Sequence, residues 1–314
     1  MIYTLTASPS LDLLMTLPDT LESGGTYRAD SEEIRPGGRG INISIMLKNL
    51  GFDSTALGFV AGFSGDELMR LTAEAGIKTG FIRVRKGRTR INLRFKDQDG
   101  EYTRINGLGP VVSDLDANYL IRRINDLKSG DFLILSGIIP PSMPQDMYKR
   151  CIEQVKNKEV SVIMDCPPEL WRDALPHNPF LFKANLRDLR SYTGCAPDNP
   201  EEIIEAARDI LKAGACNILV SLGSRGAVFV SKNSEPLHIK APSSCIIDRI
   251  GAGDSMISGF VADYITTRDI KSAAMTAVAA GTATAGTKGL GSSVQVQSLK
   301  ELIINEFENQ PQDF

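Results

Sequence analysis

Cysteine and histidine are scarce, and neither is arranged as a disulfide framework or a zinc site requires. The five cysteines are dispersed and include no C-x-x-C pair. An odd, scattered set of this kind is typical of reduced thiols in a cytoplasmic protein. The two histidines, His177 and His238, are far apart in the sequence, which argues against zinc binding.

An excess of positive charge and long apolar runs are also missing. The formal net charge is −3, which argues against nucleic-acid binding. Residues 1–5 lack a basic region before a long apolar core, so no signal peptide is predicted. The apolar stretch 273–285 is interrupted by Thr and Gly and is too short to span a bilayer. We therefore expect a cytoplasmic protein with neither nucleic-acid nor membrane partners.

Two common nucleotide-binding signatures are absent. The sequence contains no Gly-Lys dipeptide, which excludes a Walker A loop. The first predicted strand, 2–7, is followed by Ser8-Pro9-Ser10 and not by a G-x-G-x-x-G motif. A nucleotide phosphate would therefore have to bind at another helix start.

The glycine-rich stretch Gly251-Ala252-Gly253-Asp254-Ser255 opens an apolar run with helical spacing. Glycines let a ligand approach the backbone, and free N–H groups at a helix start favour an anion. A carboxylate beside such an anion hole can accept the proton of an attacking hydroxyl group. Asp254 is therefore either a catalytic base or a first-turn carboxylate that satisfies main-chain amides.

A second glycine-rich stretch, 36–40, precedes a predicted helix over 41–50. Arg39 places a cation near this helix N-terminus, which the helix dipole disfavours unless an anion binds there. The alternative is a glycine-rich turn with a solvated arginine. Residues 54–60 are then predicted to form a strand and residues 66–75 a helix. Farther along, 90–95 alternates apolar and polar residues, so a strand with one cationic face is predicted. This cationic face either belongs to a lid over an anionic substrate or is an ordinary solvated strand face.

Short β-rich runs alternate with helical stretches from residue 131 to residue 221. This alternation predicts an α/β fold, doubly wound, with a mostly parallel sheet and helices on both faces. No domain-sized linker is evident, so we expect one domain over 1–314. A small β-sheet lid, from about 12–36 and 87–107, is expected to be inserted in it.

Two further loops follow predicted strands. Asn185 and Asp188 either hold Mg²⁺ through water beside a triphosphate or form a helix cap, and both interpretations are compatible. Residues 221–227 form a glycine-containing loop that is either a ligand contact or a plain turn between two strands.

Six stretches in this order resemble the ribokinase-like (PfkB) family of carbohydrate kinases over essentially the whole chain. They are 6–12, 37–42, 87–92, 183–185, 221–223 and 251–256. Within the family, the chain is most similar to the sugar-phosphate branch, which includes 1-phosphofructokinase, tagatose-6-phosphate kinase and the minor 6-phosphofructokinase.

The resemblance implies a role for each matching residue. Asp254 matches the catalytic base, with Gly251, Ala252 and Gly253 as the anion hole. The residues implied on the sugar side are Asp12, Gly38, Arg39, Asn42, Arg88 and Arg90. Those implied on the nucleotide side are Lys183, Asn185, Ser221, Gly223 and Gly226, with Asn185 and Asp188 at the Mg²⁺ ion. Five residues depart from the family's usual pattern, namely Ser8 for Asn, Arg39 for Lys or Gly, Ile138 for Ser, Ala184 for Pro and Asp188 for Glu.

The resemblance implies an ATP- and Mg²⁺-dependent kinase that phosphorylates a hydroxymethyl group of a ketohexose phosphate. The favoured reaction converts fructose 1-phosphate to fructose 1,6-bisphosphate. Alternatives are a tagatose 6-phosphate or fructose 6-phosphate kinase, a kinase of an unphosphorylated sugar or nucleoside, and a non-catalytic sugar-phosphate sensor. Arg39, Arg88 and Arg90 are predicted to converge, which favours a phosphorylated sugar. The exposed edge of the lid favours a homodimer through this sheet.

Overall fold

The computed structural model describes residues 1–100 and 102–309, and a nine-stranded sheet forms its centre. In spatial order the strands are β15 (Ser234–Ile239), β14 (Ala227–Ser231), β13 (Asn217–Ser221), β12 (Leu181–Asn185), β11 (Ser161–Asp165), β10 (Phe132–Ser136), β1 (Ile2–Thr6), β4 (Thr55–Leu57) and β6 (Lys78–Thr79). Neighbours from β13 to β6 pair in parallel, whereas β14 and β15 are antiparallel additions at one edge.

The central strands are buried along most of their length because helices cover both faces of the sheet. All five residues of β10 are buried, and four of the five residues of β1 are buried. Each fully buried Leu or Ile side chain contributes about 1.5–3 kcal/mol through removal from water. A nearly continuous apolar run marks β10 in the sequence, whereas β1 also buries Thr4 and Thr6.

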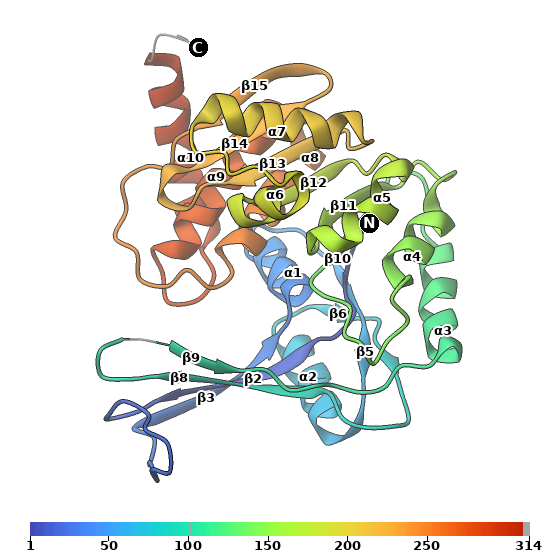
Figure 1. Cartoon of the computed structure of the whole chain (residues 1–314), viewed down its shortest axis with the longest axis vertical. Helices are drawn as coiled ribbons and strands as arrows, with labels where there is room; N and C mark the ends of the chain where they lie inside the picture. Colours follow the sequence, from blue (N-terminus) through green and yellow to red (C-terminus); the bar gives the residue numbers. More distant parts are fainter. Residues whose placement is uncertain (101, 310–314) are drawn as a thin grey trace.

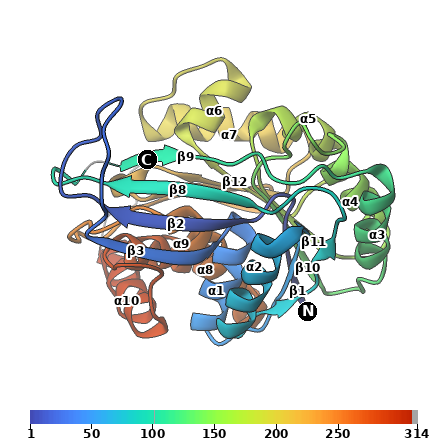
Figure 2. The same ribbon diagram turned by 90° about the horizontal axis from the view of Figure 1, so that it is seen from below.

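Two helical layers enclose the sheet, one on each face (Figures 1 and 2). One layer contains α3 (Asp114–Asn125), α4 (Met147–Val155), α5 (Trp171–Ala174), α6 (Leu186–Thr193) and α7 (Pro200–Lys212), and the other contains α1 (Arg39–Asn49), α8 (Ala252–Thr267), α9 (Ile270–Ala285) and α10 (Ser293–Asn309). Three short 3₁₀ helices are η1 (Pro168–Leu170), η2 (Leu175–His177) and η3 (Gly223–Arg225). Of the helices described, none is long and apolar enough to cross a bilayer. The predicted doubly wound fold is confirmed.

A separate four-stranded sheet extends from the main body at the bottom of Figure 1 and is seen on its broad face in Figure 2. In spatial order it contains β3 (Ser31–Gly37), β2 (Ser10–Thr16), β8 (Arg90–Lys96) and β9 (Tyr102–Ile105). Helix α2 (Gly62–Glu74) packs beside it, where Leu68 of the helix and Leu11 of β2 share one apolar cluster. We call this four-stranded sheet the lid sheet.

Two local details differ from the sequence-based expectations. The strand predicted over 54–60 divides into β4 and β5 (Phe59–Val60), and β5 pairs with β7 (Ile82–Arg83). The division falls at Gly58, whose φ is 154° and whose Cβ, if present, would lie 2.2 Å from the Thr6 carbonyl oxygen. Helix α2 begins four residues before the predicted start at Asp66. Asp12 follows the first strand and lies within β2.

The carboxyl ends of the parallel strands meet at one edge of the central sheet. Thr6 of β1 pairs in register with Ser136 of β10, which pairs with Asp165 of β11. Asn185 of β12 pairs with Ser221 of β13. Open α/β sheets bind their ligands along this edge, and the predicted site residues are concentrated there.

Candidate active site

The two glycine-rich stretches begin two helices that pack together. Gly38 is the N-cap of α1, with a φ of 126°, and Ala252 is the first residue of α8. The Ser258 hydroxyl group of α8 donates a hydrogen bond of 3.0 Å to the Ile43 carbonyl oxygen of α1. This packing brings the predicted sugar-side turn to the predicted catalytic turn.

Asp254 lies in the first turn of α8, directly after a left-handed turn at Gly251. A Cβ on Gly251, whose φ is 80°, would lie 2.6 Å from Leu290 Cδ2. A Cβ on Gly253 would lie 2.8 Å from Lys183 Nζ, so glycine here leaves room for the lysine ammonium group. The helix start therefore combines free N–H groups with a nearby cation, which suits a phosphate.

The Asp254 carboxylate is buried, and Asn42 Nδ2 donates a hydrogen bond of 2.7 Å to its Oδ2 atom. Burial raises the pKa of Asp254 to about 7, and the neighbouring Asp165 carboxylate adds to this rise. The Asn42 hydrogen bond and the cations Arg39 and Lys183 oppose it. A carboxyl group that ionises near neutral pH can accept a proton from a hydroxyl group. Asn42, predicted to contact the sugar, here orients the predicted base.

Asp165 is a central group of the site that the sequence patterns did not indicate. It ends β11 and is buried, with Arg39 Nη1 at 3.0 Å and Lys183 Nζ at 3.7 Å from its Oδ1 atom. Its Oδ2 atom is buried and has no hydrogen-bond partner among the described residues. The signal available in the sequence is the position of this carboxylate at the carboxyl end of a buried strand.

The structure gives the three predicted substrate arginines separate surroundings. Arg39 binds Asp165, and this carboxylate raises the pKa of the Arg39 guanidinium. Arg90 begins β8 and donates from Nε to the Ser8 carbonyl oxygen at 3.1 Å, while burial lowers its pKa. Arg88 is exposed in the segment before β8, so it does not share a strand face with Arg90 as predicted. Arg39 is therefore not an uncompensated cation, because Asp165 already balances its charge.

Asp12, predicted to contact the sugar, is held by a polar cluster at the base of the lid sheet. Its carboxylate accepts hydrogen bonds from Ser10 Oγ at 2.7 Å, Asn92 Nδ2 at 2.9 Å and Arg94 Nη2 at 2.6 Å. Gly37 lies so close that a Cβ there would be 2.4 Å from Asp12 Oδ1. The cluster fixes the Asp12 carboxylate through residues that the sequence analysis left unassigned.

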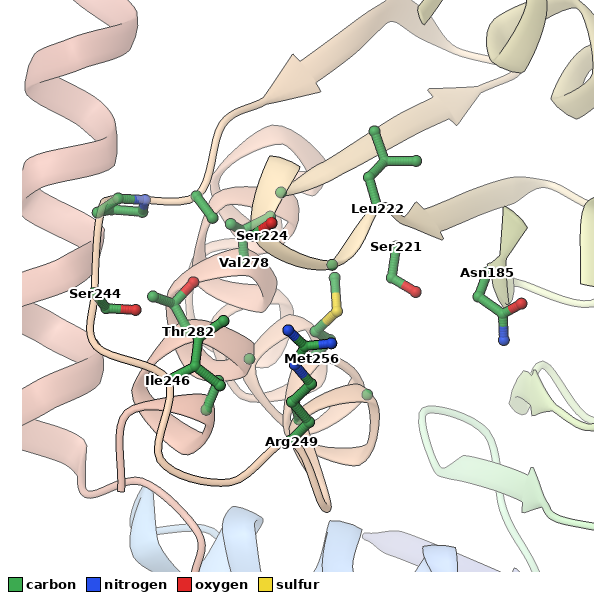
Figure 3. Close-up of a pocket in the computed structure, with 18 of the residues that line it drawn as sticks. Asn185, Ser221, Leu222, Ser224, Ser244, Ile246, Arg249, Met256, Val278 and Thr282 are labelled. Atoms are coloured by element: carbon green, nitrogen blue, oxygen red, sulfur yellow. The ribbon is translucent and has the colours of Figure 1, made fainter. Parts of the chain in front are cut away.

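A cavity of about 680 Å³ opens beside the start of α8 (Figure 3). Its lining includes the predicted nucleotide-side residues Lys183, Asn185, Ser221, Gly223 and Gly226. Its apolar wall comes from α8, α9 and the 240–250 loop, and includes Ala241, Pro242, Ile246, Met256, Val278 and Ala285. An apolar cavity of this volume with a few polar groups suits a nucleotide, and the apolar wall was not foreseen from the sequence.

Asn185 and Asp188 form the predicted helix cap at the start of α6. Asn185 Oδ1 accepts from the main-chain N–H groups of Arg187 at 2.9 Å and Asp188 at 3.0 Å. Asp188 Oδ2 accepts from the Asn185 N–H group at 3.0 Å, and burial raises the pKa of Asp188. Because the capping bonds occupy Asn185 Oδ1, its remaining group is Nδ2, a donor that suits a phosphate oxygen better than a metal ion.

Comparison with known proteins gives one consistent family. The profile described as "pfkB family carbohydrate kinase" matches residues 6–297. A 1-phosphofructokinase from Bacillus subtilis is 35% identical over 299 residues, which cover 95% of this chain and 97% of the relative. A D-tagatose-1-phosphate kinase from Bacillus licheniformis is 34% identical over 296 residues, covering 93% and 94%. The crystal structure of phosphofructokinase-2 from Escherichia coli in complex with substrates and products has a TM-score of 0.90 at 27% identity, covering 96% and 99%. The chain belongs to the pfkB family of carbohydrate kinases.

Proposed function

We propose that the protein is an ATP-dependent kinase that phosphorylates the free hydroxymethyl group of fructose 1-phosphate to give fructose 1,6-bisphosphate. The observation that carries this proposal is the buried Asp254 carboxylate at the glycine-rich start of α8, which is hydrogen-bonded by Asn42, influenced by the Lys183 ammonium group and beside a cavity of nucleotide size. The similarity to the 1-phosphofructokinase from Bacillus subtilis supports the choice of sugar phosphate.

In the proposed reaction, the hydroxymethyl oxygen attacks the γ-phosphorus of ATP. A new O–P bond forms, the bond to the β–γ bridging oxygen breaks, and ADP leaves with that electron pair. The hydroxyl proton passes to Asp254, and we assign it to Oδ1 because Asn42 holds Oδ2. The N–H groups at the start of α8 and the Lys183 ammonium group stabilise the charge on the transferred phosphoryl group.

Mg²⁺ is part of this proposal, and the residues present fit it. The partner-free, buried Oδ2 atom of Asp165 and the Asp188 carboxylate are the groups that would hold the ion, directly or through water. Among the described residues no cluster of three or more His, Cys, Asp or Glu side chains forms a metal cage. This suits Mg²⁺, which keeps several waters and binds phosphate oxygens beside one or two carboxylates. When bound, the ion would neutralise charge on the triphosphate.

We assign the phosphate already carried by the sugar to Arg90. Its Nε atom bonds the Ser8 carbonyl oxygen, which orients the guanidinium and leaves its Nη groups for a bidentate contact with phosphate. Arg88, in the segment that leads into β8, is the second cation on this side. The exposed Ile138 stands at the position where the family usually has a hydroxyl group, so these arginines carry most of the phosphate recognition.

A second candidate substrate is tagatose 1-phosphate. The relative from Bacillus licheniformis is named a D-tagatose-1-phosphate kinase and is almost as similar to this chain as the Bacillus subtilis relative. Tagatose and fructose differ only in the configuration at C4, so both present the same phosphate and the same hydroxymethyl group. The two substrates must therefore be compared directly.

The test is a coupled assay of ADP release with fructose 1-phosphate, tagatose 1-phosphate, fructose 6-phosphate, tagatose 6-phosphate and free fructose. We expect the highest kcat/KM for fructose 1-phosphate. Arg90→Gln should lower kcat/KM for the phosphosugar by about 10- to 100-fold, as expected for loss of hydrogen bonds to a charged group, and change fructose little. Arg122→Gln, an exposed arginine on α3, is the control.

Other outcomes of the panel identify the competing functions. A wild type that prefers free fructose, or equal losses on charged and uncharged sugars in Arg90→Gln, would contradict a phosphosugar substrate. Sugar-phosphate binding without ADP release from any substrate would identify a sensor. The retained Asp254 argues against a sensor, because binding alone needs no base.

We further propose that two copies assemble through the lid sheet. Its outer strands expose apolar side chains, with Ile34 of β3 52% exposed and Ile105 of β9 53% exposed. Unpaired edge strands with apolar side chains favour pairing with another chain. A tetrameric inhibited form is described for phosphofructokinase-2 from Escherichia coli, a structural relative with a TM-score of 0.88.

We place the reaction in the cytoplasm. All five cysteines are free thiols, and Cys195 and Cys245 are exposed. Exposed thiols persist in a reducing compartment, where sugar phosphates and ATP are also found.

A further inference from the structure

One arginine in the cavity beside α8 has no role in the mechanism above. Arg249 lies in the loop that leads into α8, and Figure 3 shows its side chain directed into the cavity. The main chain around it is held by two hydrogen bonds, from Ala252 N to Arg249 O at 3.4 Å and from Ile250 N to Asp248 Oδ1 at 2.9 Å. The side chain is therefore attached to a defined turn immediately before the anion hole.

The guanidinium of Arg249 has no partner of its own. Among the described residues, no side-chain hydrogen bond and no ion pair involves it, and the residue is exposed to the cavity and solvent. Two other arginines around the site are matched to carboxylates: Arg39 to Asp165 and Arg94 to Asp12. Arg249 is thus a cation that the site leaves uncompensated.

The composition of the cavity wall shows what such a cation would bind. The lining residues that the structure describes include two cations, Lys183 and Arg249, and no carboxylate. Lys183 is buried and lies 3.7 Å from Asp165, so part of its charge is already balanced. A cavity wall with a net positive charge favours an anionic ligand, and a guanidinium offers it paired N–H donors.

We propose that Arg249 binds the phosphates that remain on the nucleotide after transfer, and so sets the affinity for ATP and ADP. This inference rests on the proposed kinase function. The transferred phosphoryl group belongs at the glycine-rich start of α8, beside Lys183 and Asp254. Arg249 precedes that turn by two residues and faces the space between it and the apolar wall at Ile246. The nucleobase fits the apolar wall, which leaves the diphosphate opposite the guanidinium.

Calorimetric titration of the full chain with ADP and with adenosine tests this assignment, because ADP carries only the non-transferred phosphates and adenosine carries none. We expect Arg249→Gln to bind ADP at least about tenfold more weakly and adenosine with less than about twofold change, as for a lost charged hydrogen bond. Arg249→Lys should lie between, since an ammonium group keeps the charge and loses the fork geometry. Arg208→Gln, an exposed arginine on α7 outside the cavity, is the matched control.

Steady-state kinetics give a second readout. Arg249→Gln should raise the KM for ATP by a factor similar to the loss of ADP affinity and leave the KM for the sugar phosphate unchanged. Unchanged ADP affinity in Arg249→Gln, or equal losses for ADP and adenosine, would overturn the assignment while the kinase function stands. A wild type that binds neither ATP nor ADP would overturn the proposed function itself, and this inference with it.

Discussion

Asp254 meets two requirements that oppose each other. A base must be ionised to accept a proton, yet burial disfavours the ionised form of this carboxylate and raises its pKa to about 7. Asn42, Arg39 and Lys183 lower the cost of the ionised form; Arg39 and Asn42 lie in the first turn of α1, and Lys183 lies in β12. The result is a carboxylate basic enough to take a hydroxyl proton and still ionised near neutral pH.

Replacement of this carboxylate tests its role directly. Asp254→Asn should lower kcat by about 10²- to 10⁴-fold, the range for loss of a general base, because the amide cannot accept the hydroxyl proton. Affinity for ADP should be preserved, since the N–H groups of the turn remain. The control is Asp263→Asn, also on α8 but away from the cavity, which removes a carboxylate paired with Lys300 of α10. An Asp254→Asn enzyme with more than about a tenth of wild-type kcat would refute the assignment.

The raised pKa also predicts the pH dependence. Below about pH 7 the Asp254 carboxyl group holds its proton and cannot act as a base, so kcat/KM should rise about tenfold from about pH 6 to about pH 8 and then level off. Between about pH 3.8 and pH 7, the Asp254 carboxyl group binds its proton in the folded state and releases it in the unfolded state. The contribution of Asp254 to the stability of the folded state therefore falls as the pH rises through that window. Sugar-phosphate affinity measured over the same range separates ionisation of the substrate from that of the enzyme. A flat kcat/KM profile would be incompatible with Asp254 as the base.

At the level of elements, glycines allow the turns that carry the site. Gly226 joins η3 to β14 with a φ of 91°, and a Cβ there would lie 2.0 Å from the Ile239 carbonyl oxygen of β15. Two penalties therefore apply to any other residue at this position. The backbone conformation, with φ 91° and ψ −129°, is one that other residues rarely adopt and costs about 1–3 kcal/mol, and the contact forces β15 away from β14.

A pair of glycines separates these two penalties. Gly130 has a φ of 81° but nothing within 4 Å of its Cβ position. Gly130→Ala should thus show only the backbone cost of about 1–2 kcal/mol, whereas Gly226→Ala should lose about 2 kcal/mol more. Urea unfolding of both variants measures the difference in free energy. Equal losses would show that β15 yields to the added methyl group at no cost.

The elements themselves were largely predictable, whereas their contacts were not. Apolar runs revealed the buried strands, and glycine-rich stretches revealed the starts of α1 and α8, because both depend on neighbouring residues. The contact between Asn42 and Asp254 joins residues 212 positions apart, and no local pattern encodes it. Asp165 carries no local sequence signal for the same reason, since its importance comes from Arg39 and Lys183, which belong to other elements.

On the scale of the whole molecule, the lid sheet differs from the central sheet because the helices that the structure describes do not cover both of its faces (Figures 1 and 2). It consists of four strands, and its outer strand β9 is exposed along its whole length. The main body buries its strands between two helical layers, but β9 has no such cover. A second copy that packs against the lid sheet would bury Ile34 and Ile105 and would hold the lid over the sugar side of the site.

Assembly through the lid sheet therefore predicts a linked change in mass and activity. The double variant Ile34→Lys with Ile105→Lys should shift the protein from dimer to monomer in sedimentation velocity, because two buried ammonium groups per chain would oppose pairing. The same variant should raise the KM for the sugar phosphate, since the lid carries Arg90 and Arg94, and should leave ADP affinity unchanged because the nucleotide cavity lies in the main body. Val294→Lys, at a residue 74% exposed on α10, controls for added surface charge. A wild type that sediments as a monomer, or a double variant that remains a dimer, would exclude the lid sheet as the interface.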